Sequence, residues 1–347
     1  MKKNKILVTG GGGFLGKAII KMLVERGDHV SSFSRHFYPE LANMGVKQFQ
    51  GDIADPYEVE KACTDIDMVF HVAAKAGVSG RWADYFKPNV IGTENIVKAC
   101  LKHGVRYLIH TSSPSVVFDG NDMEGVDESA PYPARYHAPY PATKAIAERI
   151  VVNAASDQLK TVILRPHLIW GPEDNHLLPG IIARHKRLKR VGDGKNLVDT
   201  IYIDNAAHAH ILAGDKLKEE DKIKFRHSIS GKVYFISQDA PVLLWKMVDD
   251  MLNAADLPPI KGSVSLKTAE MAGVVIETIF NLLKIEKEPP MTQFMAKELA
   301  TSHWFDIARA KKDLGYYPIV STQEGVIRLK NWLLSKNCKL FKKGCYR

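Results

Sequence analysis

Cysteine is scarce in this chain. Four cysteines occur among 347 residues, at positions 63, 100, 338 and 345, and their spacing matches neither a metal-binding motif nor a disulfide framework. This usage is typical of proteins in a reducing compartment. We therefore expect a cytoplasmic protein without a bound metal, in which Cys63 and Cys100 are small core residues.

Long apolar runs are also absent. A membrane-spanning helix needs about 18 or more consecutive apolar residues, and no run reaches that length. The apolar run after the basic N-terminus is too short and too rich in glycine for a signal peptide. With 45% hydrophobic and 25% charged residues, the composition indicates an ordinary globular chain, long enough for one large domain and a smaller appended part.

Acidic residues are missing from the C-terminus. Residues 336–347 contain five basic residues and no acid, and they contribute more than half of the net charge of +9. The simplest interpretation is a solvated tail. The alternative is a contact with anionic lipid or with a partner protein. No nucleic-acid-binding motif accompanies this charge, so we expect no nucleic acid partner.

A glycine-rich segment follows the first short apolar run. Residues 9–16 read T-G-G-G-G-F-L-G, in which Gly10, Gly13 and Gly16 fit the spacing T-G-x-x-G-x-x-G of a strand-to-helix turn. Gly10 permits the tight turn, Gly13 lets the backbone approach a pyrophosphate, and Gly16 allows the helix to pack closely on the strand. The start of that helix would bind the phosphates through its unpaired N–H groups. The segment therefore predicts a dinucleotide site.

Strand-like and helix-like segments alternate through the first half of the chain. Strands are predicted at 5–9, 29–33, 46–49, 68–72, 107–111 and 161–164, and helices at 56–63, 90–103 and 142–156. This alternation predicts an α/β fold of the Rossmann type with a doubly wound parallel sheet. We expect an NADP-binding domain over 1–171 and a mainly helical, substrate-binding part over 172–347. Within that part, residues 198–240 are expected to return to the first domain.

Tyr140 and Lys144 form a Y-x-x-x-K pair where a helix is expected to begin. Pro141 suits the first helical turn, which places Lys144 about one turn after Tyr140 and near the same face. A neighbouring ammonium would stabilise the phenolate and lower the pKa of Tyr140, so that Tyr140 could exchange a proton with a substrate oxygen. Ser113 follows the fifth predicted strand, where ligands of parallel sheets bind, and could hydrogen-bond the same oxygen. These three residues are the predicted catalytic group.

No acidic residue ends the second predicted strand. Sites that prefer NAD usually place Asp or Glu about 20 residues beyond the glycines, on the ribose 2′-hydroxyl. Here Arg35 stands 19 positions after Gly16, where a guanidinium can pair with a 2′-phosphate. The sequence therefore favours NADP(H). In the alternative, Arg35 points to solvent and NAD(H) can bind as well.

Together these residues resemble the extended short-chain dehydrogenase/reductase superfamily and, within it, the 3β-hydroxysteroid dehydrogenase family. The resemblance covers nearly the whole chain and depends most on residues 70–78, 111–120 and 165–172. It implies that Asn89 supports the active-site helix. The cofactor contacts that it implies, with the glycine turn and Arg35 included, are Gly10, Gly13, Phe14, Leu15, Gly16, Arg35, Asp52, Ile53, Ala73, Ala74, Lys75, Thr111, Tyr140, Lys144, Pro166 and Leu168.

Within that family the chain resembles the bacterial 2-alkyl-3-oxoalkanoate reductases of olefin biosynthesis. This resemblance implies NADPH-dependent reduction of a lipid-like β-keto acid, acyl-processing enzymes as partners, and a homodimer. The alternative is a 3β-hydroxysteroid or sterol-4-carboxylate 3-dehydrogenase. A sugar-nucleotide epimerase or dehydratase and a non-catalytic NADP sensor are further alternatives.

Both the keto acid and the sterol acid would need an anion-binding group and an apolar cavity. The candidate partners for the carboxylate are Lys75, Arg81, His167 and His176, and the cavity candidates are Trp82, Leu177 and Leu178. The apolar stretch 272–283 is expected to be a packed helix. If it were exposed instead, it could admit a lipid-like substrate or contact a membrane peripherally.

Overall fold

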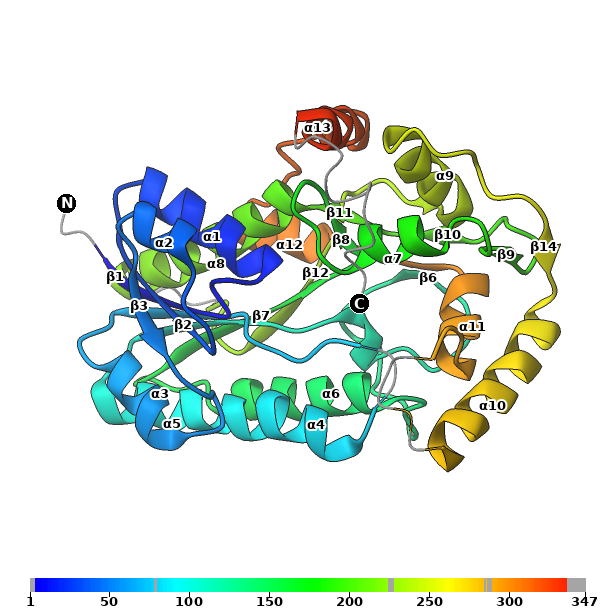
Figure 1. The fold of residues 1–347 in the computed structure, drawn as a ribbon. Coiled ribbons are helices and arrows are strands. Elements are labelled where there is room, and N and C mark those ends of the chain that lie inside the picture. Colours follow the sequence, from blue (N-terminus) through cyan, green and yellow to red (C-terminus); the bar gives the residue numbers. More distant parts are fainter. Residues whose placement is uncertain (1–3, 78–79, 224–227, 284, 286–288, 336–347) are drawn as a thin grey trace.

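A seven-stranded sheet runs through the middle of the molecule (Figure 1). The computed structural model describes residues 4–77, 80–223, 228–283, 285 and 289–335, so the basic tail and the last two cysteines lie outside the described residues. Every neighbouring pair in this sheet is parallel. The strand order is β12-β7-β5-β4-β1-β2-β3, with bounds β12 Lys232–Ile236, β7 Lys160–Pro166, β5 Tyr107–Thr111, β4 Met68–His71, β1 Lys5–Thr9, β2 His29–Ser34 and β3 Lys47–Gln50.

Helices cover both faces of this sheet. In Figure 1, α1 (Phe14–Glu25), α8 (Ile203–Ile223) and α12 (Ala308–Leu314) lie on one side, and α3 (Pro56–Cys63), α5 (Gly92–His103) and α6 (Pro139–Asn153) lie on the other. Side chains of β1 alternate between the two cores, because Ile6 and Val8 belong to one cluster and Leu7 to the other. Cys63 and Cys100 are buried in the second core. The predicted doubly wound α/β fold is therefore confirmed.

The boundaries of the elements follow the sequence pattern closely. The helix predicted at 56–63 has those bounds, and α6 begins three residues earlier than expected, at Pro139. Proline is well suited to that first helical position because its missing N–H has no intrahelical partner there. One π-helical turn, Lys87–Ile91, precedes α5 and was not predicted.

A second, four-stranded sheet of order β13-β10-β15-β6 lies beside the main one. It takes β6 (Met123–Val126) from the first half of the chain and β10 (Leu197–Val198), β13 (Val242–Leu243) and β15 (His303–Phe305) from the second. In the opposite direction, β12 completes the main sheet, and α8 packs against β5 and β7. Segments from both sides of residue 171 therefore build each sheet.

The remaining elements are α2 (Pro39–Asn43), α4 (Trp82–Phe86), a 3-10 turn (Pro114–Val116), β8 (Ile169–Trp170), α7 (Leu177–Arg184), β9 (Arg190–Val191), β11 (Ile201–Tyr202), α9 (Leu244–Ala254), β14 (Ser263–Val264), α10 (Leu266–Leu282), α11 (Gln293–Ala300) and α13 (Thr322–Ser335).

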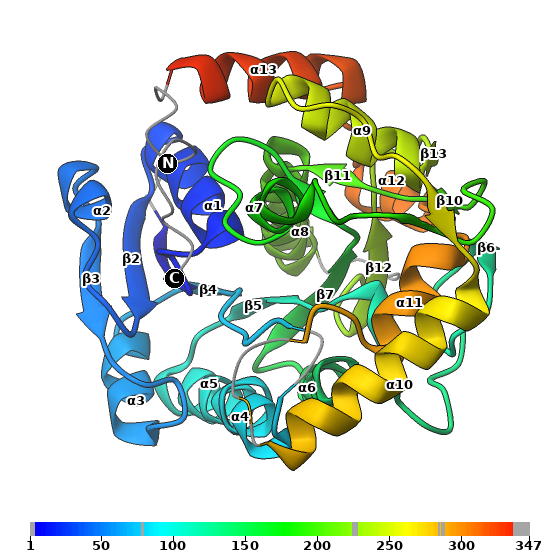
Figure 2. The same cartoon turned by 45° about the vertical axis from the view of Figure 1, so that its right-hand side comes forward.

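Helix α10 exposes an apolar face at the edge of the molecule. Its inner side packs on α11 (Figure 2), where Gly273 lies so close that a Cβ there would be 2.7 Å from the Gln293 nitrogen. On its outer side and just beyond its end, the side chains of Met271, Val274, Val275, Ile279, Leu282 and Leu283 are 44–76% exposed. The expectation of a fully packed helix was therefore wrong for this outer side. None of the helices in the described ranges is long and apolar enough to cross a membrane.

A buried ion pair holds α6 against the main sheet. Arg165 of β7 binds Glu148 of α6 through two hydrogen bonds, Nε to Oε2 at 3.1 Å and Nη2 to Oε1 at 2.5 Å, and both side chains are at most 3% exposed. The Tyr132 hydroxyl donates to the same carboxylate at 2.7 Å. The guanidinium also lies over the Phe235 ring, 5.1 Å from its centroid. These contacts set the position of α6 relative to β7.

We expect Arg165→Met to destabilise the fold strongly. The substitution leaves the Glu148 carboxylate buried without its cation, and breaking a buried pair in this way costs about 3–5 kcal/mol. Urea denaturation followed by circular dichroism measures the loss. The double variant Arg165→Met/Glu148→Leu removes both charges and should recover most of the stability. A single variant within about 1 kcal/mol of wild type would contradict this role.

Candidate active site

The glycine turn connects β1 to α1 and brings three backbone segments together. Gly10 has φ +70°, and its amide donates to the Phe33 carbonyl at 2.8 Å. A Cβ at Gly10 would lie 2.9 Å from the Cα of Ala73, and one at Gly16 would lie 2.3 Å from the Gly10 carbonyl oxygen. Both positions therefore require glycine. Helix α1 begins at Phe14 without a side-chain cap, which leaves its first N–H groups for a phosphate.

Tyr38 covers this turn, which the sequence did not predict. A Cβ at Gly12 would come within 2.4 Å of three atoms of the Tyr38 ring, so the tyrosine lies directly on the glycine backbone. The Lys17 ammonium, one residue after the last glycine, binds Glu173 at 2.7 Å and Glu40 at 3.4 Å. The turn is thus bordered by groups from α2 and from the segment after β8.

The segment after β4 is held by side chains from neighbouring elements. The amides of Val72 and Ala73 both donate to the Thr9 hydroxyl at 3.1 Å. Asn89 accepts from the Lys75 amide at 2.7 Å and donates to the Lys75 carbonyl at 3.1 Å and to the Thr143 hydroxyl at 3.0 Å. Asn89 therefore ties this segment to α6, which agrees with its expected supporting role. Ala73 lies against Gly10 of the glycine turn, and Ala74 and Lys75 follow it along this segment.

Arg35 and Asp52 lie near each other, beyond the ends of β2 and β3. Arg35 is exposed, and its charge helps to lower the pKa of Asp52, whose carboxylate accepts a hydrogen bond from the Ala54 amide and binds Lys87 at 2.9 Å. Ile53 is buried, and its side chain packs against Gly92. The structure thus places a solvent-accessible guanidinium just after the second strand, where the sequence predicted one.

Ser113 and Tyr140 meet beyond the carboxyl end of β5. The Ser113 hydroxyl lies close enough to that of Tyr140 to lower its pKa, and it is hydrogen-bonded to the Ser115 hydroxyl at 2.9 Å. Lys144, one turn along α6, is 2% exposed and donates to the Thr111 carbonyl at 2.6 Å. Its ammonium is 3.4 Å from Nε2 of His110. The three predicted catalytic residues therefore lie around the end of one strand.

The pKa values of Tyr140 and Lys144 depend mainly on burial. Burial raises the pKa of Tyr140, an effect that the Glu298 carboxylate strengthens and the Ser113 hydrogen bond opposes. Burial also lowers the pKa of Lys144 to about 8, against an opposing effect from Glu148. We expected Lys144 to lower the pKa of Tyr140. The structure gives the opposite direction, because the ammonium is directed at the Thr111 carbonyl and Tyr140 is desolvated.

Buried histidines underlie the site, and no periodic pattern in the sequence predicted them. The His71 and His110 rings lie 5.1 Å apart, and His210 hydrogen-bonds to the Thr111 hydroxyl at 2.8 Å. Burial lowers the pKa of His71 to about 3, of His210 to about 4, and of His110 well below its usual value. All three are therefore neutral at neutral pH and add no charge beside Lys144.

The segment after β7 forms another side of the site. Pro166 is buried at the end of the strand, and Leu168 has φ +44°, a left-handed backbone conformation that is uncommon for leucine. His167 donates from Nδ1 to the Asp199 carbonyl at 2.9 Å, and its ring lies 4.8 Å from that of His303. Burial and His303 lower the pKa of His167 well below its ordinary value. His167 is therefore neutral and brings no positive charge to the site, and its contact with a substrate carboxylate stays a prediction.

The other predicted partners of the carboxylate are engaged or lie at the surface. Lys75 and Arg81 both bind Asp84, at 3.7 and 3.1 Å, and His176 is exposed at the start of α7. Among the cavity candidates, Leu178 is buried in the main core. Trp82 is 47% exposed and stacks on Phe86. Lys75, Arg81 and His176 therefore do not form an anion-binding site in this structure.

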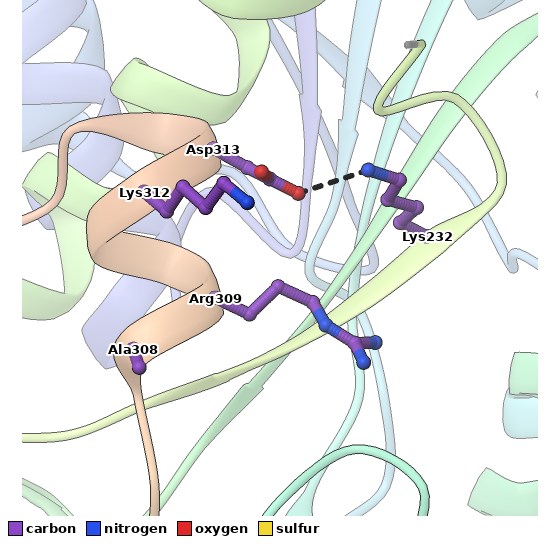
Figure 3. Close-up of a pocket in the computed structure, with 5 residues that line it drawn as sticks. All are labelled: Lys232, Ala308, Arg309, Lys312 and Asp313. Atoms are coloured by element: carbon purple, nitrogen blue, oxygen red, sulfur yellow. Dashed lines mark hydrogen bonds and ion pairs between the residues drawn. The ribbon is translucent and has the colours of Figure 1, made fainter.

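One surface cavity lies away from these residues. It has a volume of about 530 Å³ and is bordered by β12 and α12, where Lys232 pairs with Asp313 (Figure 3). Its lining is Lys232, Ala308, Arg309, Lys312 and Asp313. None of the predicted site residues is among them.

The glycine turn and the Ser113, Tyr140 and Lys144 group on a Rossmann-type sheet define an NAD(P)-dependent oxidoreductase. The chain belongs to the 3-beta hydroxysteroid dehydrogenase/isomerase family, whose sequence profile matches residues 7–267. A 2-alkyl-3-oxoalkanoate reductase from Stenotrophomonas maltophilia is 47% identical over 330 residues, which cover 94% of this chain and 98% of the relative. A sterol-4-alpha-carboxylate 3-dehydrogenase from Mus musculus is 32% identical and covers 94% and 90%.

Solved structures confirm the fold alone. MoeE5, solved in complex with UDP-glucuronic acid and NAD, has a TM-score of 0.72 at 22% identity and covers 96% of this chain and 99% of its own. At that identity the similarity extends to the arrangement of elements and not to the substrate.

We expect Gly16→Ala to weaken cofactor binding by about 5- to 150-fold, which corresponds to about 1–3 kcal/mol of overpacking. The added methyl would meet the Gly10 carbonyl oxygen and push α1 away from the turn. Titration of NADPH fluorescence measures the dissociation constant. Gly180→Ala is the matched control, because a Cβ at Gly180 in α7 meets nothing within 4 Å. Equal affinities for the two variants would contradict the predicted turn geometry.

Proposed function

We propose that this protein is an NADP(H)-dependent reductase of 2-alkyl-3-oxoalkanoic acids, and that its 2-alkyl-3-hydroxy products belong to long-chain olefin biosynthesis. The observation that carries the proposal is the meeting of Ser113 and Tyr140 beyond the end of β5, beside the buried Lys144. The substrate class is supported by the 47% identity to 2-alkyl-3-oxoalkanoate reductases from two bacteria over nearly the whole chain. The more distant sterol-4-carboxylate dehydrogenases supply the alternative.

The residues at the glycine turn fit a bound dinucleotide. Gly10 and Gly16 let the turn pack directly against the backbone of Ala73 and against the start of α1, and the first N–H groups of α1 are available to the pyrophosphate. Arg35 would bind the 2′-phosphate of NADP(H), and Lys144 would bind the ribose hydroxyls next to the nicotinamide. When bound, NADPH supplies the hydride for the carbonyl carbon at position 3 of the substrate.

Tyr140 would donate the proton that converts the developing alkoxide to the alcohol. The raised pKa of Tyr140 keeps the phenol protonated at neutral pH, as a general acid must be before it donates. Ser113, whose hydroxyl lies near that of Tyr140, would hold the same substrate oxygen. Lys144 keeps three donor protons and uses one on the Thr111 carbonyl, so that others remain for the cofactor.

The exposed face of α10 supports a lipid-like substrate. Contiguous apolar surface of this kind is uncommon on soluble proteins outside binding sites, and Met271, Val275 and Leu282 are each more than half exposed. In this proposal α10 borders the route of the alkyl chains, and its outer side can rest against a membrane surface that holds them.

We expect Tyr140→Phe to lower kcat for the keto acid by about 10²- to 10⁴-fold, the usual contribution of a positioned acid. NADPH affinity should stay within about twofold of wild type, because the ring is retained. The assay follows NADPH oxidation with a 2-alkyl-3-oxoalkanoic acid and identifies the 2-alkyl-3-hydroxy product by mass spectrometry.

The control for this variant is Tyr317→Phe, which removes a hydroxyl from a tyrosine that is 61% exposed. Unchanged turnover in Tyr140→Phe would refute its catalytic role. Turnover of sterol-4-carboxylates but not of alkyl keto acids by the wild type would favour the alternative substrate class. Interconversion of sugar nucleotides without net NADPH oxidation would indicate an epimerase.

We expect Arg35→Ala to lower kcat/KM for NADPH by about tenfold or more, and to leave kcat/KM for NADH nearly unchanged. The reason is that only NADPH carries the 2′-phosphate that this exposed guanidinium would pair with. Steady-state kinetics with both cofactors measure the ratio. Lys61→Ala, which removes an exposed positive charge from α3, is the control for a general effect of charge. Equal losses with both cofactors would contradict the predicted preference for NADP(H).

A further inference from the structure

The outer side of α10 is apolar over most of its length. Val275 and Leu282 are seven residues apart, so they lie on the same side of the helix, and both are more than half exposed. Glu277 is the only charged residue from 271 to 283. It is directed at α11, where its carboxylate accepts hydrogen bonds from the backbone and side-chain nitrogens of Gln293 at 3.3 and 3.2 Å. The exposed members of this apolar face are Met271, Val274, Val275, Ile279, Leu282 and Leu283.

A run of basic residues follows α7. Residues 184–190 read R-H-K-R-L-K-R and contain no acid. The side chains of Lys186, Arg187 and Lys189 are exposed, and none of the three forms an ion pair with another described residue. The last residue of the run, Arg190, is bound by an aspartate of α9 at 2.8 Å. This basic segment therefore carries positive charge that the neighbouring side chains leave largely uncompensated.

Strand pairing holds the basic segment beside the start of α10. Its last residue, Arg190, lies opposite Ser263 in the parallel pair of β9 and β14, and its amide donates to the Gly262 carbonyl at 3.1 Å. Helix α10 begins at Leu266, two residues after β14. Leu188 and Leu266 also pack against the same hydrophobic cluster. The basic segment and α10 therefore belong to one edge of the molecule, along which β14 and α10 follow each other in Figure 1.

Further positive charge lies where the basic segment meets α10. Lys261 and Lys267 stand on either side of β14, and both are exposed. Residues 184–195 contain six basic residues and one acid, and residues 261–270 contain two basic residues and one acid. This edge is therefore positive at the start of α10 and apolar along the rest of the helix.

An apolar helix side that is continuous with a positive patch fits the surface of an anionic lipid bilayer. Helices of this kind lie in the plane of the membrane, with their apolar side in the boundary between headgroups and acyl chains, and nearby lysines and arginines attract anionic lipids. With 17 residues, α10 is about 25 Å long, which is enough to contact several lipids. A second copy of this chain would fit the apolar side alone, because its own edge carries the same positive charge.

We propose that this edge is a membrane-binding surface, in which the apolar face of α10 enters an anionic bilayer and the basic segment binds the phosphate headgroups. The inference rests on the proposed function for its purpose, which is to take a long-chain keto acid from the membrane that holds it. It adds to that function a requirement for lipids of negative charge, and it assigns a role to residues 184–190, which lie outside the catalytic group.

Flotation of the full chain with lipid vesicles tests this surface. We expect binding to vesicles of phosphatidylcholine that contain about 30% phosphatidylglycerol, and binding at least about tenfold weaker to phosphatidylcholine alone. Raising the salt concentration from about 0.05 M to about 0.5 M should weaken the binding to anionic vesicles by about tenfold or more, because salt screens the headgroup charge.

Lys186→Gln/Lys189→Gln should weaken binding to the anionic vesicles by about 30-fold, since each basic residue near such a surface contributes a similar share of the affinity. The matched control is Lys21→Gln/Lys330→Gln, which removes the same charge from exposed positions on α1 and α13. Figure 1 shows both helices away from β14 and α10. The control should bind within about threefold of wild type, because headgroup attraction falls off within a Debye length.

Val275→Gln/Leu282→Gln should weaken binding by about tenfold or more, because two exposed apolar side chains no longer enter the bilayer. Glutamine keeps the helix propensity of α10, and circular dichroism should show an unchanged fold. The matched control is Ile327→Gln/Leu334→Gln on α13, where the replaced side chains are 55% and 58% exposed.

Three results would overturn the inference. The first is equal binding to neutral and anionic vesicles, or equal losses in the variants and their controls. The second is a loss of binding only when the four lysines of residues 336–347 are replaced by glutamine, which would assign the lipid contact to the C-terminal tail. The third is a loss of self-association in Val275→Gln/Leu282→Gln without a change in vesicle binding, which would show that a second copy covers α10.

Flotation requires no turnover, so the inference and the proposed function can fail separately. A wild type that reduces a short, water-soluble 2-alkyl-3-oxo acid but does not bind anionic vesicles would overturn the inference and leave the function. Binding to anionic vesicles with loss in both α10-edge variants, without reduction of any keto acid, would support the surface and refute the function.

Discussion

The site depends on the parallel register of four neighbouring strands. Thr9 of β1 pairs with His71 of β4, His71 with His110 of β5, and Thr111 of β5 with Leu164 of β7. Because these strands run in one direction and end nearly level, the segments that leave them meet at the same edge of the sheet. The glycine turn, the Ala73 segment, Ser113 and His167 all follow these ends. Any change in register would move a catalytic group away from the cofactor turn.

Burial determines the charge of the ionisable side chains at this edge of the sheet. It raises the pKa of Tyr140 and Glu298 and lowers that of Lys144 and the underlying histidines. In each case the neutral form is favoured, because a charge in a low-dielectric interior lacks the solvation that water gives. The buried pair of Arg165 and Glu148 lies between β7 and α6, one helical turn along α6 from Lys144, and is held by two hydrogen bonds. The edge of the sheet at the site therefore has little charge apart from Lys144, and the ion pair that orients α6 lies on the same face of the helix.

Local sequence patterns predicted much of this arrangement because they act over a few residues. The glycine spacing, the branched runs and the proline at the start of α6 each determine backbone conformation over one turn or one strand, and the observed elements follow them closely. The same reasoning failed for α10. An apolar run predicts burial only when another element covers it, and the structure leaves Met271, Val275 and Leu282 on the outer side of α10 exposed.

By itself, the sequence determined the α/β class, the glycine turn and the family, and it predicted the Ser113, Tyr140 and Lys144 group, since each depends on residue types in local patterns. Only the tertiary structure decided which charged groups act on one another. Glu298 is 158 positions from Tyr140 in the chain, and the Lys75 and Arg81 charges are taken up by Asp84. The physical reason is that a pKa depends on distance and solvation, which long-range packing sets, and no spacing along the chain encodes them.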